Sequence, residues 1–309
     1  MCLPRIARTS ALLLVVLTMV ILSGCSVTKH QSKDDITIGD EVCSLKNNLK
    51  TYLLLGIDTE GSLREEKEPG QGGQSDAIYL LVCDEEKKRV HIVGIPRDTM
   101  TEIKVFLPSG KYNGTSIDHL TLQYAFGNGM EYSCQLMREA VSNLLYGIPI
   151  HGYAALNLGA VPDLADALGG VDVVVPDDSA VSEESSFKKG AKVTLQRDNI
   201  KKFLRFRDTE TNLSASIRMD RHKAFFRGCS KKLRSLIEDD PASIIRLYNA
   251  WSSEFLTDIG PEECARLAGF DFEEEVELIP GEYISDLDFD EFYVDGESLK
   301  KMVKRLFCQ

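Results

Sequence analysis

Short runs of apolar residues alternate along this chain with amphipathic segments whose apolar positions recur at helical spacing. The run 51–58 holds three consecutive leucines, which predicts a strand whose two faces are both covered. The runs 76–83 and 89–95 flank a polar turn and predict a β-hairpin. Between Glu131 and Tyr146 apolar residues recur at helix spacing and Gly147 follows, which predicts a helix that stops there.

The same alternation continues towards the C-terminus. The pattern predicts strands at 151–157, 171–176 and 274–281, and helices at 160–170, 241–256, 261–268 and 296–307. Strands that alternate with helices are typical of a sheet layered by helices. We therefore expect an α/β fold, an αβα sandwich in which helices cover both faces of a central mixed β-sheet.

The N-terminus differs from the rest of the chain. Arg5 and Arg8 precede a largely apolar run of 12 residues, 11–22, which is shorter than the roughly 20 residues of a membrane-spanning helix. The run ends in Leu-Ser-Gly-Cys, which resembles a bacterial lipobox with Cys25 as the lipid-modified residue. The alternative is an uncleaved signal anchor in which Cys25 is an ordinary thiol. Both interpretations place the rest of the chain outside the cytoplasm.

The chain therefore divides into three parts. We assign 1–24 to a lipoprotein-type signal peptide, 25–47 to a lipid-anchored flexible tether and 48–309 to a single domain. The tether is predicted because this stretch is polar and its apolar residues follow no period. No internal repeat and no clear second linker interrupts the long C-terminal part.

Charge and cysteine content narrow the possible functions. The 309 residues include 48 Asp and Glu against 36 Lys and Arg, a formal net charge of −12. Nucleic-acid binding needs a net basic face for the phosphates, so we exclude it. The six cysteines beyond Cys25 lack the CxxC spacing of a zinc site, and the sequence leaves any disulfide pairing open. Cys83 and Cys134 lie in apolar patterns and are expected to be small buried side chains.

Charged residues gather at the ends of the predicted strands. Asp76 begins one strand of the hairpin while Arg97 and Asp98 end the other, so antiparallel pairing brings them side by side. Asp58 follows the first strand and reaches the same edge if that strand runs parallel to 89–95. The alternative for any one pair is a surface salt bridge of little energetic worth.

Four further arginines follow in two pairs. Arg205 and Arg207 lie two residues apart in the segment 202–209, so in a strand they share one face. Arg218 and Arg221 lie three apart near the start of a predicted helix, on one side of it. Cations at a helix start oppose the macrodipole, which predicts an anionic partner there. The alternative is a solvated face paired with neighbouring acidic residues.

Clustered arginines in so acidic a chain indicate a phosphate ligand, because guanidinium groups match phosphate oxygens bidentately. Two aspartates beside them suit Mg²⁺, a hard ion usually shared between carboxylates and substrate phosphates. Together these groups indicate phosphoryl chemistry by charge stabilisation. His119 and His222 adjoin the charged segments and are expected either to touch substrate or to be ordinary half-buried histidines. The glycine-rich stretch 70–75 is a weak phosphate-loop candidate, because it follows no strand directly and opens no helix.

The order of these motifs resembles the LytR-CpsA-Psr family. The segments LLLGID, SDAIYLLVC, GIPRDT, YAFGNG, LRFRDT and RMDRHKAFF occur in that order between Leu53 and Phe226. The resemblance implies an extracytoplasmic phosphotransferase that moves a glycopolymer, teichoic-acid-like or capsular, from a polyprenyl-pyrophosphate carrier onto peptidoglycan with Mg²⁺. It also implies an α/β sandwich with an apolar pocket for the polyprenyl tail, and marks 240–309 as a more divergent C-terminal extension of the domain.

The resemblance implies individual roles as well. Asp58 and Asp76 would hold Mg²⁺, and Asp98 would orient Arg97 or assist deprotonation of the acceptor. The pyrophosphate would be bound by a larger set, Arg97, Arg205, Arg207, Arg218, Arg221 and His119. A lipid on Cys25 would anchor the enzyme to the outer face of the cytoplasmic membrane, where its donor lies. Two alternatives keep the fold: a polyprenyl-pyrophosphate phosphatase with water as acceptor, and a non-catalytic binding or regulatory lipoprotein of the cell envelope.

Overall fold

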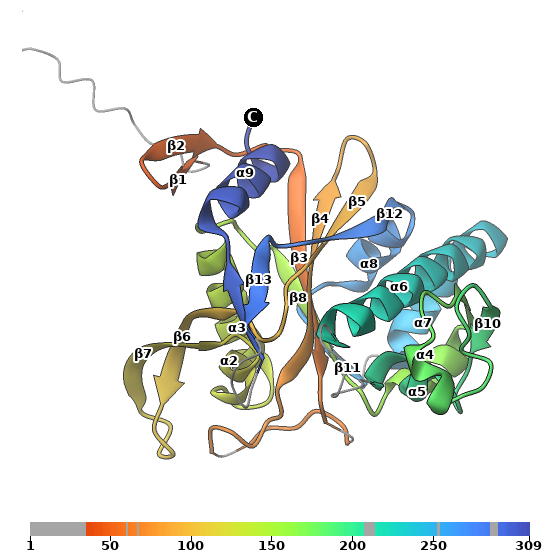
Figure 1. Cartoon of the computed structure of the whole chain (residues 1–309). Coiled ribbons are helices and arrows are strands. Elements are labelled where there is room, and N and C mark those ends of the chain that lie inside the picture. Colours follow the sequence, from red (N-terminus) through yellow and green to blue (C-terminus); the bar gives the residue numbers. More distant parts are fainter. Residues whose placement is uncertain (1–34, 60, 67, 207–213, 252–253, 285–289) are drawn as a thin grey trace, which may run out of the picture. The chain divides into compact units, whose positions relative to one another are not determined.

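The centre of the fold is a six-stranded mixed β-sheet of the order β11-β8-β3-β4-β5-β12 (Figure 1). The computed structural model describes residues 35–59, 61–66, 68–206, 214–251, 254–284 and 290–309, and Ile36–Gln309 forms one compact unit. The strands of the sheet are β3 (Leu49–Ile57), β4 (Ser75–Asp84), β5 (Arg89–Gly94), β8 (Gly152–Asn157), β11 (Phe255–Thr257) and β12 (Asp271–Leu278).

The predicted hairpin of β4 and β5 is confirmed. The two strands pair antiparallel, with Leu80 opposite Val93. On its other side β4 pairs antiparallel with β3, so β3 and β5 run in the same direction. The carboxyl ends of β3 and β5 therefore meet the amino end of β4 at one edge of the sheet, as the placement of the charged residues required.

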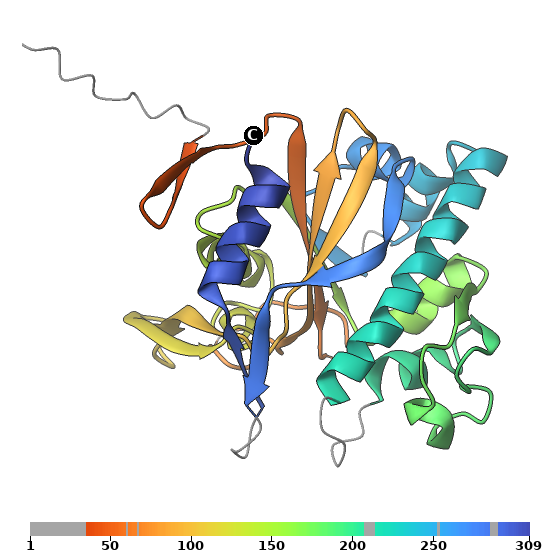
Figure 2. The ribbon, with the colours of Figure 1, turned by 45° about the horizontal axis from the view of Figure 1, so that its top comes forward.

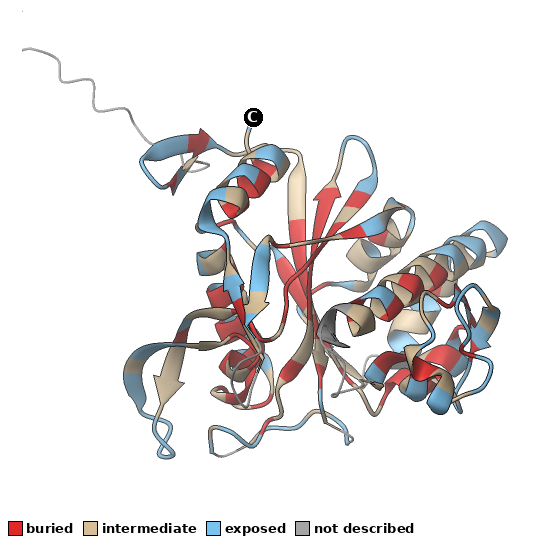
Figure 3. Cartoon of the chain, viewed as in Figure 1, coloured by how far each residue is buried: buried red, intermediate tan, exposed pale blue. Residues whose placement is uncertain are grey.

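Helices cover both faces of this sheet. On one side lie α2 (Leu122–Ala125), α3 (Glu131–Leu144) and α9 (Gly296–Phe307), and on the other lie α6 (Ser214–Asp239) and α8 (Pro261–Ala268) (Figure 2). Leu53 and Leu55 are buried in the apolar cluster of the first face, whereas Tyr52 and Leu54 belong to that of the second. Buried positions accordingly concentrate in the central strands (Figure 3), and the predicted αβα sandwich is confirmed.

A separate small cluster lies beside the sheet. Its elements are α4 (Val161–Ala167), β9 (Val171–Val174), a 3₁₀ turn (Ser179–Ser182), β10 (Lys192–Leu195) and α5 (Ile200–Arg205). The predicted strand at 171–176 exists as β9, but it pairs with β10 in a two-stranded sheet of its own. The buried rings of Phe187 and Phe203 meet edge to face there at 5.2 Å between centroids. This local core gives the strand a partner outside the central sheet.

Two segments differ from their predicted secondary structure. The segment 202–209, predicted as a strand, begins inside α5, and its residues from 207 onwards lie outside the described ranges. Ile200, Phe203 and Leu204 are buried at helical spacing, and this signal outweighs the alternation that suggested a strand. The single helix predicted at 241–256 is shorter, because α7 (Ser243–Trp251) gives way to β11, where Leu256 pairs with Ala155 of β8.

Two hairpins lie outside the central sheet. They are formed by β6 (Met100–Phe106) with β7 (Tyr112–His119) and by β13 (Gly281–Ile284) with β14 (Glu291–Val294). Within the ranges that the structure describes, no helix is both long and apolar enough to cross a membrane. Cys83 and Cys134 are fully buried, as their apolar surroundings predicted.

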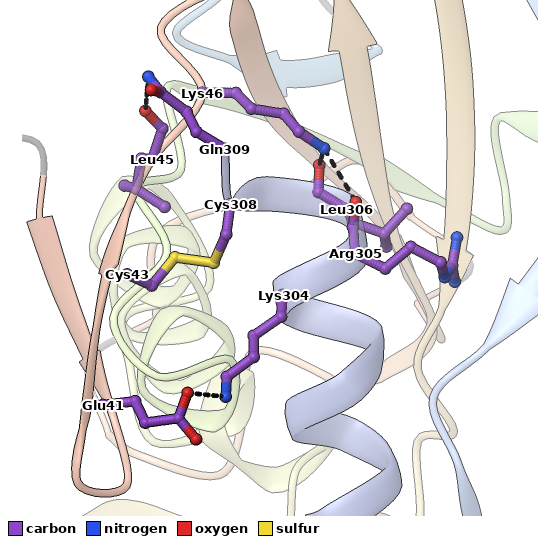
Figure 4. The surroundings of a disulfide bond; sticks show 9 residues. All are labelled: Glu41, Cys43, Leu45, Lys46, Lys304, Arg305, Leu306, Cys308 and Gln309. Carbon is purple, nitrogen blue, oxygen red and sulfur yellow. Dashed lines mark hydrogen bonds and ion pairs between the residues drawn. A yellow bond between two sulfur atoms is a disulfide. The ribbon is translucent and has the colours of Figure 1, made fainter.

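A disulfide bond joins the two ends of this unit (Figure 4). Cys43 lies in β2 (Glu41–Ser44), which pairs with β1 (Asp35–Ile38), and it is bonded to Cys308 directly after α9. The two cysteines are 265 residues apart in sequence, and their Cα atoms are 5.8 Å apart. Residues 35–44 are therefore folded against the C-terminal helix, which corrects the predicted extent of the tether, 25–47.

Polar contacts reinforce the same junction. The Lys46 ammonium donates to the carbonyl oxygens of Arg305 and Leu306 at 2.8 and 2.9 Å, at the end of α9 (Figure 4). Glu41 pairs with Lys304 at 2.5 Å. Cations near the last carbonyls of a helix are favoured by its dipole. The covalent bond and these contacts together order a stretch whose polar sequence, without apolar periodicity, had predicted a flexible tether.

Candidate functional site

The charged edge of the sheet is assembled by the β4–β5 hairpin. Tyr79 pairs with Gly94, and the Ile95 amide continues the ladder by donating to the Ile78 carbonyl at 3.0 Å. Pro96 follows and ends the pairing, because proline has no amide hydrogen to donate. The first residue beyond it, Arg97, therefore lies opposite the start of β4, where Asp76 stands.

Arg97 is held between two carboxylates. Its Nη1 donates to Oδ1 of Asp76, and its Nε donates to Oδ1 of Asp98 at 3.1 Å. Burial opposes the positive charge, but the two carboxylates outweigh this effect and raise the pKa of Arg97. In the described part of the chain its third nitrogen, Nη2, has no hydrogen-bond partner. That N–H group remains available to an incoming oxygen.

The backbone around Arg97 is fixed on several sides. The Thr99 amide and hydroxyl both donate to the Pro96 carbonyl, at 3.1 and 2.6 Å. The Thr121 amide donates to the Arg97 carbonyl at 3.0 Å, and the Phe292 amide donates to the Asp98 carbonyl at 2.9 Å. The turn is thus closed by Thr99 and is held from outside by the residue before α2 and by β14. These bonds fix the backbone position of Arg97.

A small pocket opens beside this arginine. Its lining includes Asp76, Tyr79, Arg97, Asp98, Arg218, Met219, His222 and Tyr283. The free space is about 10 Å³, room for one water molecule, so a larger ligand must displace lining side chains. The pocket joins a charged wall, made by the sheet edge and Arg218, to an apolar wall. Such a combination suits a ligand with an anionic head and an apolar tail.

The start of α6 approaches the sheet closely at this pocket. A Cβ atom on Gly94 would lie 2.9 Å from Cε of Met219 and 2.7 Å from Cδ2 of Leu278. A side chain on residue 94 would therefore have to displace the ends of both neighbouring side chains. The absence of a side chain here lets α6 bring Arg218 to the same pocket as Arg97.

His222 lies one helical turn after Arg218 and is held as a neutral imidazole. Its Nε2 donates to the Leu204 carbonyl at 3.0 Å, so Nδ1 is the acceptor for the Tyr79 hydroxyl at 2.8 Å. Burial, and after it the positive charge of Arg218, lowers the pKa of His222 to about 4. The side chain links α5, α6 and β4 and adds no positive charge to the pocket.

Asp58 stands at the neighbouring strand end, where Gly56 pairs with Ala77 of β4. Its Oδ1 accepts the Gln74 amide at 2.6 Å, and its own amide donates to the Gln74 carbonyl at 3.0 Å. Asp58 thus follows the end of β3, and Asp76 lies at the start of the adjacent strand β4. One carboxylate oxygen of each accepts a hydrogen bond from the protein. The second oxygen of each is a hard donor of the kind that Mg²⁺ prefers. Among the described residues no group of three His, Cys, Asp or Glu side chains is arranged to hold a metal ion.

Arg221 is placed differently from its expected role in phosphate binding. It is 1% exposed, and its Nε donates to the Phe203 carbonyl at 2.8 Å. The other guanidinium nitrogens donate to the Phe206 carbonyl, to Ser179 and to Asp177. Burial lowers the pKa of Arg221, and Asp177 partly offsets this effect. The side chain therefore ties the end of α5 to α6, and nothing in these contacts points it into the pocket.

The remaining predicted site residues lie elsewhere. Arg205 is the last residue of α5 and is exposed, and it is not part of the pocket lining. His119 ends β7, where its ring contacts the Asp118 carboxylate and the Asp290 carbonyl, both at 3.1 Å. Arg207 and Cys25 fall outside the described residues.

Sequence reasoning missed the apolar wall of the pocket. In the sequence Tyr79 and Met219 occupy positions typical of the buried face of a strand and of a helix. No local signal distinguishes them as pocket residues. Tyr283 comes from β13, in the part of the chain that we took for a divergent extension. That extension therefore contributes directly to the candidate site.

The geometry defines an α/β sandwich in which Arg97 lies between two carboxylates at the edge of the central sheet. The family model described as the LytR_cpsA_psr family matches residues 18–278, so the chain belongs to this family and the resemblance is confirmed. A curated relative from Bacillus cereus, the polyisoprenyl-teichoic acid–peptidoglycan teichoic acid transferase TagU, is 32% identical over 168 residues. The match covers 54% of this chain and 47% of that protein, so the chain spans about half the length of such relatives.

Solved structures share the fold. Bacillus subtilis TagV aligns with a TM-score of 0.62 and 22% identity over 84% of this chain and 96% of its own. The structure described as TagT bound to LI-WTA aligns with a TM-score of 0.60 and 20% identity, over 84% and 90% of the two chains. At these identities the likeness establishes the fold alone.

Proposed function

We propose that this protein is a phosphotransferase of the cell envelope that transfers a polyprenyl-pyrophosphate-linked glycopolymer to peptidoglycan. The observation that carries the proposal is the convergence of Asp76, Arg97, Asp98 and Arg218 on one pocket with an apolar wall. The name of the curated TagU relative, a teichoic acid transferase that acts on peptidoglycan, supports the same class of reaction. A teichoic-acid-like polymer is therefore our first candidate, and a capsular polysaccharide is the second.

Arg97 and Arg218 would bind the pyrophosphate. Guanidinium groups in a partly buried pocket stabilise the charge that develops on phosphate oxygens during transfer. Asp98 would serve to orient Arg97, because its Oδ1 accepts a hydrogen bond from Nε. Its Oδ2 is buried and lacks a hydrogen-bond partner in the described structure, so assistance to deprotonation stays a prediction. Arg205, Arg207 and His119 likewise stay predicted phosphate ligands.

Mg²⁺ would be held by Asp58 and Asp76. The donor chemistry fits, since both residues are carboxylates at adjacent strand ends and each has an oxygen that no described group uses. Because the described residues offer no third acidic or imidazole ligand, phosphate oxygens and water would complete the coordination. When bound, the ion would supply neutralisation of phosphate charge.

Localisation follows from the same scheme. A lipid on Cys25 would tether the domain to the outer face of the cytoplasmic membrane, next to a carrier lipid embedded in it. Mass spectrometry of the N-terminus of protein purified from cells tests this step. A diacylated Cys25 at the mature N-terminus is expected, and an intact segment 1–25 would contradict it.

The activity itself is tested with full-length protein in detergent micelles. The protein is incubated with Mg²⁺, a polyprenyl-pyrophosphate-linked oligosaccharide and uncrosslinked peptidoglycan strands. We expect carrier monophosphate and a covalently linked glycan in equal amounts. Carrier monophosphate with no linked glycan would instead indicate a phosphatase. A donor that binds and is never turned over would indicate a non-catalytic lipoprotein.

A further inference from the structure

The loop that connects β3 to β4 lies at the lower edge of the sheet (Figure 1). Residues of this loop line a second cavity. Its volume is about 540 Å³, within the range of roughly 300–1,000 Å³ that is typical of small-molecule sites. The polar part of its lining comprises Thr59, Ser62, Arg64, Glu66 and Gln71. Among the residues that the structure describes, it shares no lining residue with the pocket beside Arg97.

The loop that forms this cavity is anchored on two sides. The Asn157 side chain, at the end of β8, donates to the Gly61 carbonyl at 2.7 Å. On the other side the Glu66 amide donates to the Asn128 carbonyl between α2 and α3 at 2.8 Å, and the Gly70 amide donates to the Ala125 carbonyl at the end of α2 at 2.6 Å. A Cβ atom on Gly72 would lie only 2.6 Å from Cα of Gly129, so the two backbones are in direct contact. These contacts make the cavity a preformed part of the fold.

Several side chains of the lining offer hydrogen-bond donors and acceptors, while most of the surface that faces the cavity is apolar. Ser62 offers a hydroxyl group, and Gln71 offers an amide that contacts Glu68 at 3.3 Å. Arg64 pairs with Glu66 at 2.8 Å, so the guanidinium adds no net charge to attract a phosphate. The Thr59 hydroxyl oxygen is buried and has no hydrogen-bond partner in the described structure. Such a lining suits a neutral, hydroxyl- and amide-bearing saccharide better than an anion.

The cavity and the pocket beside Arg97 lie at different strand ends along the same edge of the sheet. The strand order β8-β3-β4-β5 places the cavity at the ends of β8 and β3, where Thr59 directly follows Asp58. Arg97 lies at the end of β5, and Asp76 lies between them at the start of β4. The two candidate metal ligands thus separate the cavity from the pocket with the apolar wall.

In-line phosphoryl transfer needs this kind of separation. The attacking oxygen and the leaving oxygen lie on opposite sides of the transferred phosphorus. The apolar wall at Met219 and Tyr283 suits the lipid carrier, which leaves. The attacking hydroxyl must then approach from the other side, and the β3–β4 loop cavity lies away from that wall along the strand order.

We propose that this β3–β4 loop cavity is the subsite for the acceptor saccharide, a role that rests on the proposed function. A sugar hydroxyl of the acceptor forms a new O–P bond to the polymer-bearing phosphorus. The bond between this phosphorus and the bridging oxygen of the pyrophosphate breaks. The carrier leaves with the lipid-bound phosphate, as its monophosphate. The hydroxyl proton passes to solvent, so the step needs no further reactant.

Steady-state kinetics of the full-length protein test the assignment. The variants Gln71→Ala and Thr59→Val should raise the KM for uncrosslinked peptidoglycan strands roughly five- to tenfold, the loss of about one hydrogen bond. The KM for the polyprenyl-pyrophosphate donor should stay at its original value. Thr59→Val removes a hydroxyl without a partner and keeps the shape, so it should not lower the unfolding temperature. Gln196→Ala, an exposed glutamine in the β10–α5 turn, is the matched control and should change neither KM.

The outcomes separate this assignment from the function on which it rests. A raised donor KM in both variants would place the donor's own polymer in the cavity and overturn the proposal. An unchanged acceptor KM in both would overturn it as well. Isothermal titration with soluble disaccharide strands is independent of turnover and should give weaker binding for both variants. Wild-type protein that binds the strands in this cavity and never turns over donor would overturn only the phosphotransferase function.

Discussion

Asp76 accepts a hydrogen bond from Arg97 across the β4–β5 hairpin, although 21 residues separate them in sequence. The pair sits at the end of the hairpin far from its turn, where the two strands have just ceased to pair. Asp98 holds the same guanidinium from the other side. This arrangement engages two nitrogens of the guanidinium, Nε and Nη1, and leaves Nη2 without a hydrogen-bond partner in the described structure.

The first prediction concerns this pair. Arg97→Ala and Asp76→Asn should each lower kcat for donor turnover by roughly 10²–10³-fold. The first removes a cation that stabilises charge on the transferred phosphate, and the second weakens the carboxylate that holds Arg97 and would bind Mg²⁺. Radiolabelled donor and thin-layer separation of the carrier monophosphate provide the measurement. Arg197→Ala breaks an exposed pairing with Asp163 and Asp166 and is the matched control, expected to keep full turnover. If Arg97→Ala turned over donor as fast as the control, this pocket would have no role in the reaction.

The second prediction concerns the metal ion. Chelation with EDTA should abolish turnover, and added Mg²⁺ should restore it. Asp58→Asn should raise the Mg²⁺ concentration needed for half-maximal rate about tenfold, because it replaces a charged ligand by a neutral one. The donor-dependent binding of Mn²⁺, followed by electron paramagnetic resonance, should weaken in the same variant. Identical Mg²⁺ dependence of wild type and Asp58→Asn would contradict the assignment.

The third prediction separates two arginines on one helix. Arg221→Met should lower the free energy of unfolding by about 3–5 kcal/mol, because it leaves the carbonyl groups of Phe203 and Phe206 without their donor and removes the cation beside the partly buried Asp177. Arg218→Met should lower kcat/KM for the donor with a smaller loss of stability, because Arg218 lines the pocket. Urea unfolding and donor kinetics on both variants provide the comparison. Equal destabilisation of the two variants would argue against the structural role of Arg221.

The fourth prediction concerns pH. Burial lowers the pKa of His222 from 6.5 to about 4, so the unfolded chain takes up a proton at a higher pH than the fold does. Stability should therefore fall as the pH drops from about 6.5 to about 4, by up to about 3 kcal/mol, and this contribution changes no further below that window. His222→Gln keeps a donor and an acceptor and does not titrate. Its unfolding free energy should fall less steeply over this window, and parallel curves would contradict the assignment.

The fifth prediction concerns the disulfide. Cys43→Ser or Cys308→Ser should lower the free energy of unfolding by about 2–5 kcal/mol, because the bond restricts a very long loop in the unfolded chain. The melting temperature should drop by roughly 4–15 °C, measured by calorimetry, and reductant should reproduce the drop in the wild type. Cys264→Ser, which removes a free cysteine, is the control. A wild-type melting temperature that reductant leaves unchanged would show that the bond adds no stability.

Much of the fold was predictable because its signals are local. The consecutive leucines of β3 and the polar turn between β4 and β5 depend on neighbours within one element. The helix at 296–307 was predicted with its observed bounds, since its apolar stripe and flanking residues lie close in sequence. The prediction of a strand at 202–209 was wrong for its described part, 202–206. Two arginines that alternate with apolar residues imitate a strand there, whereas three buried residues at helical spacing form α5.

The sequence by itself determined the α/β class, the edge of the sheet and the residues that meet there. Each follows from periodicity and from the antiparallel pairing of two adjacent strands, which brings Asp76 to Arg97 without further information. Only the tertiary structure decided that Arg221 is internal, that Tyr283 lines the pocket and that Cys43 reaches Cys308. These relationships join distant segments whose packing depends on shape and on the burial of polar groups. No local pattern encodes such contacts, because many partners in the same chain have equivalent chemistry.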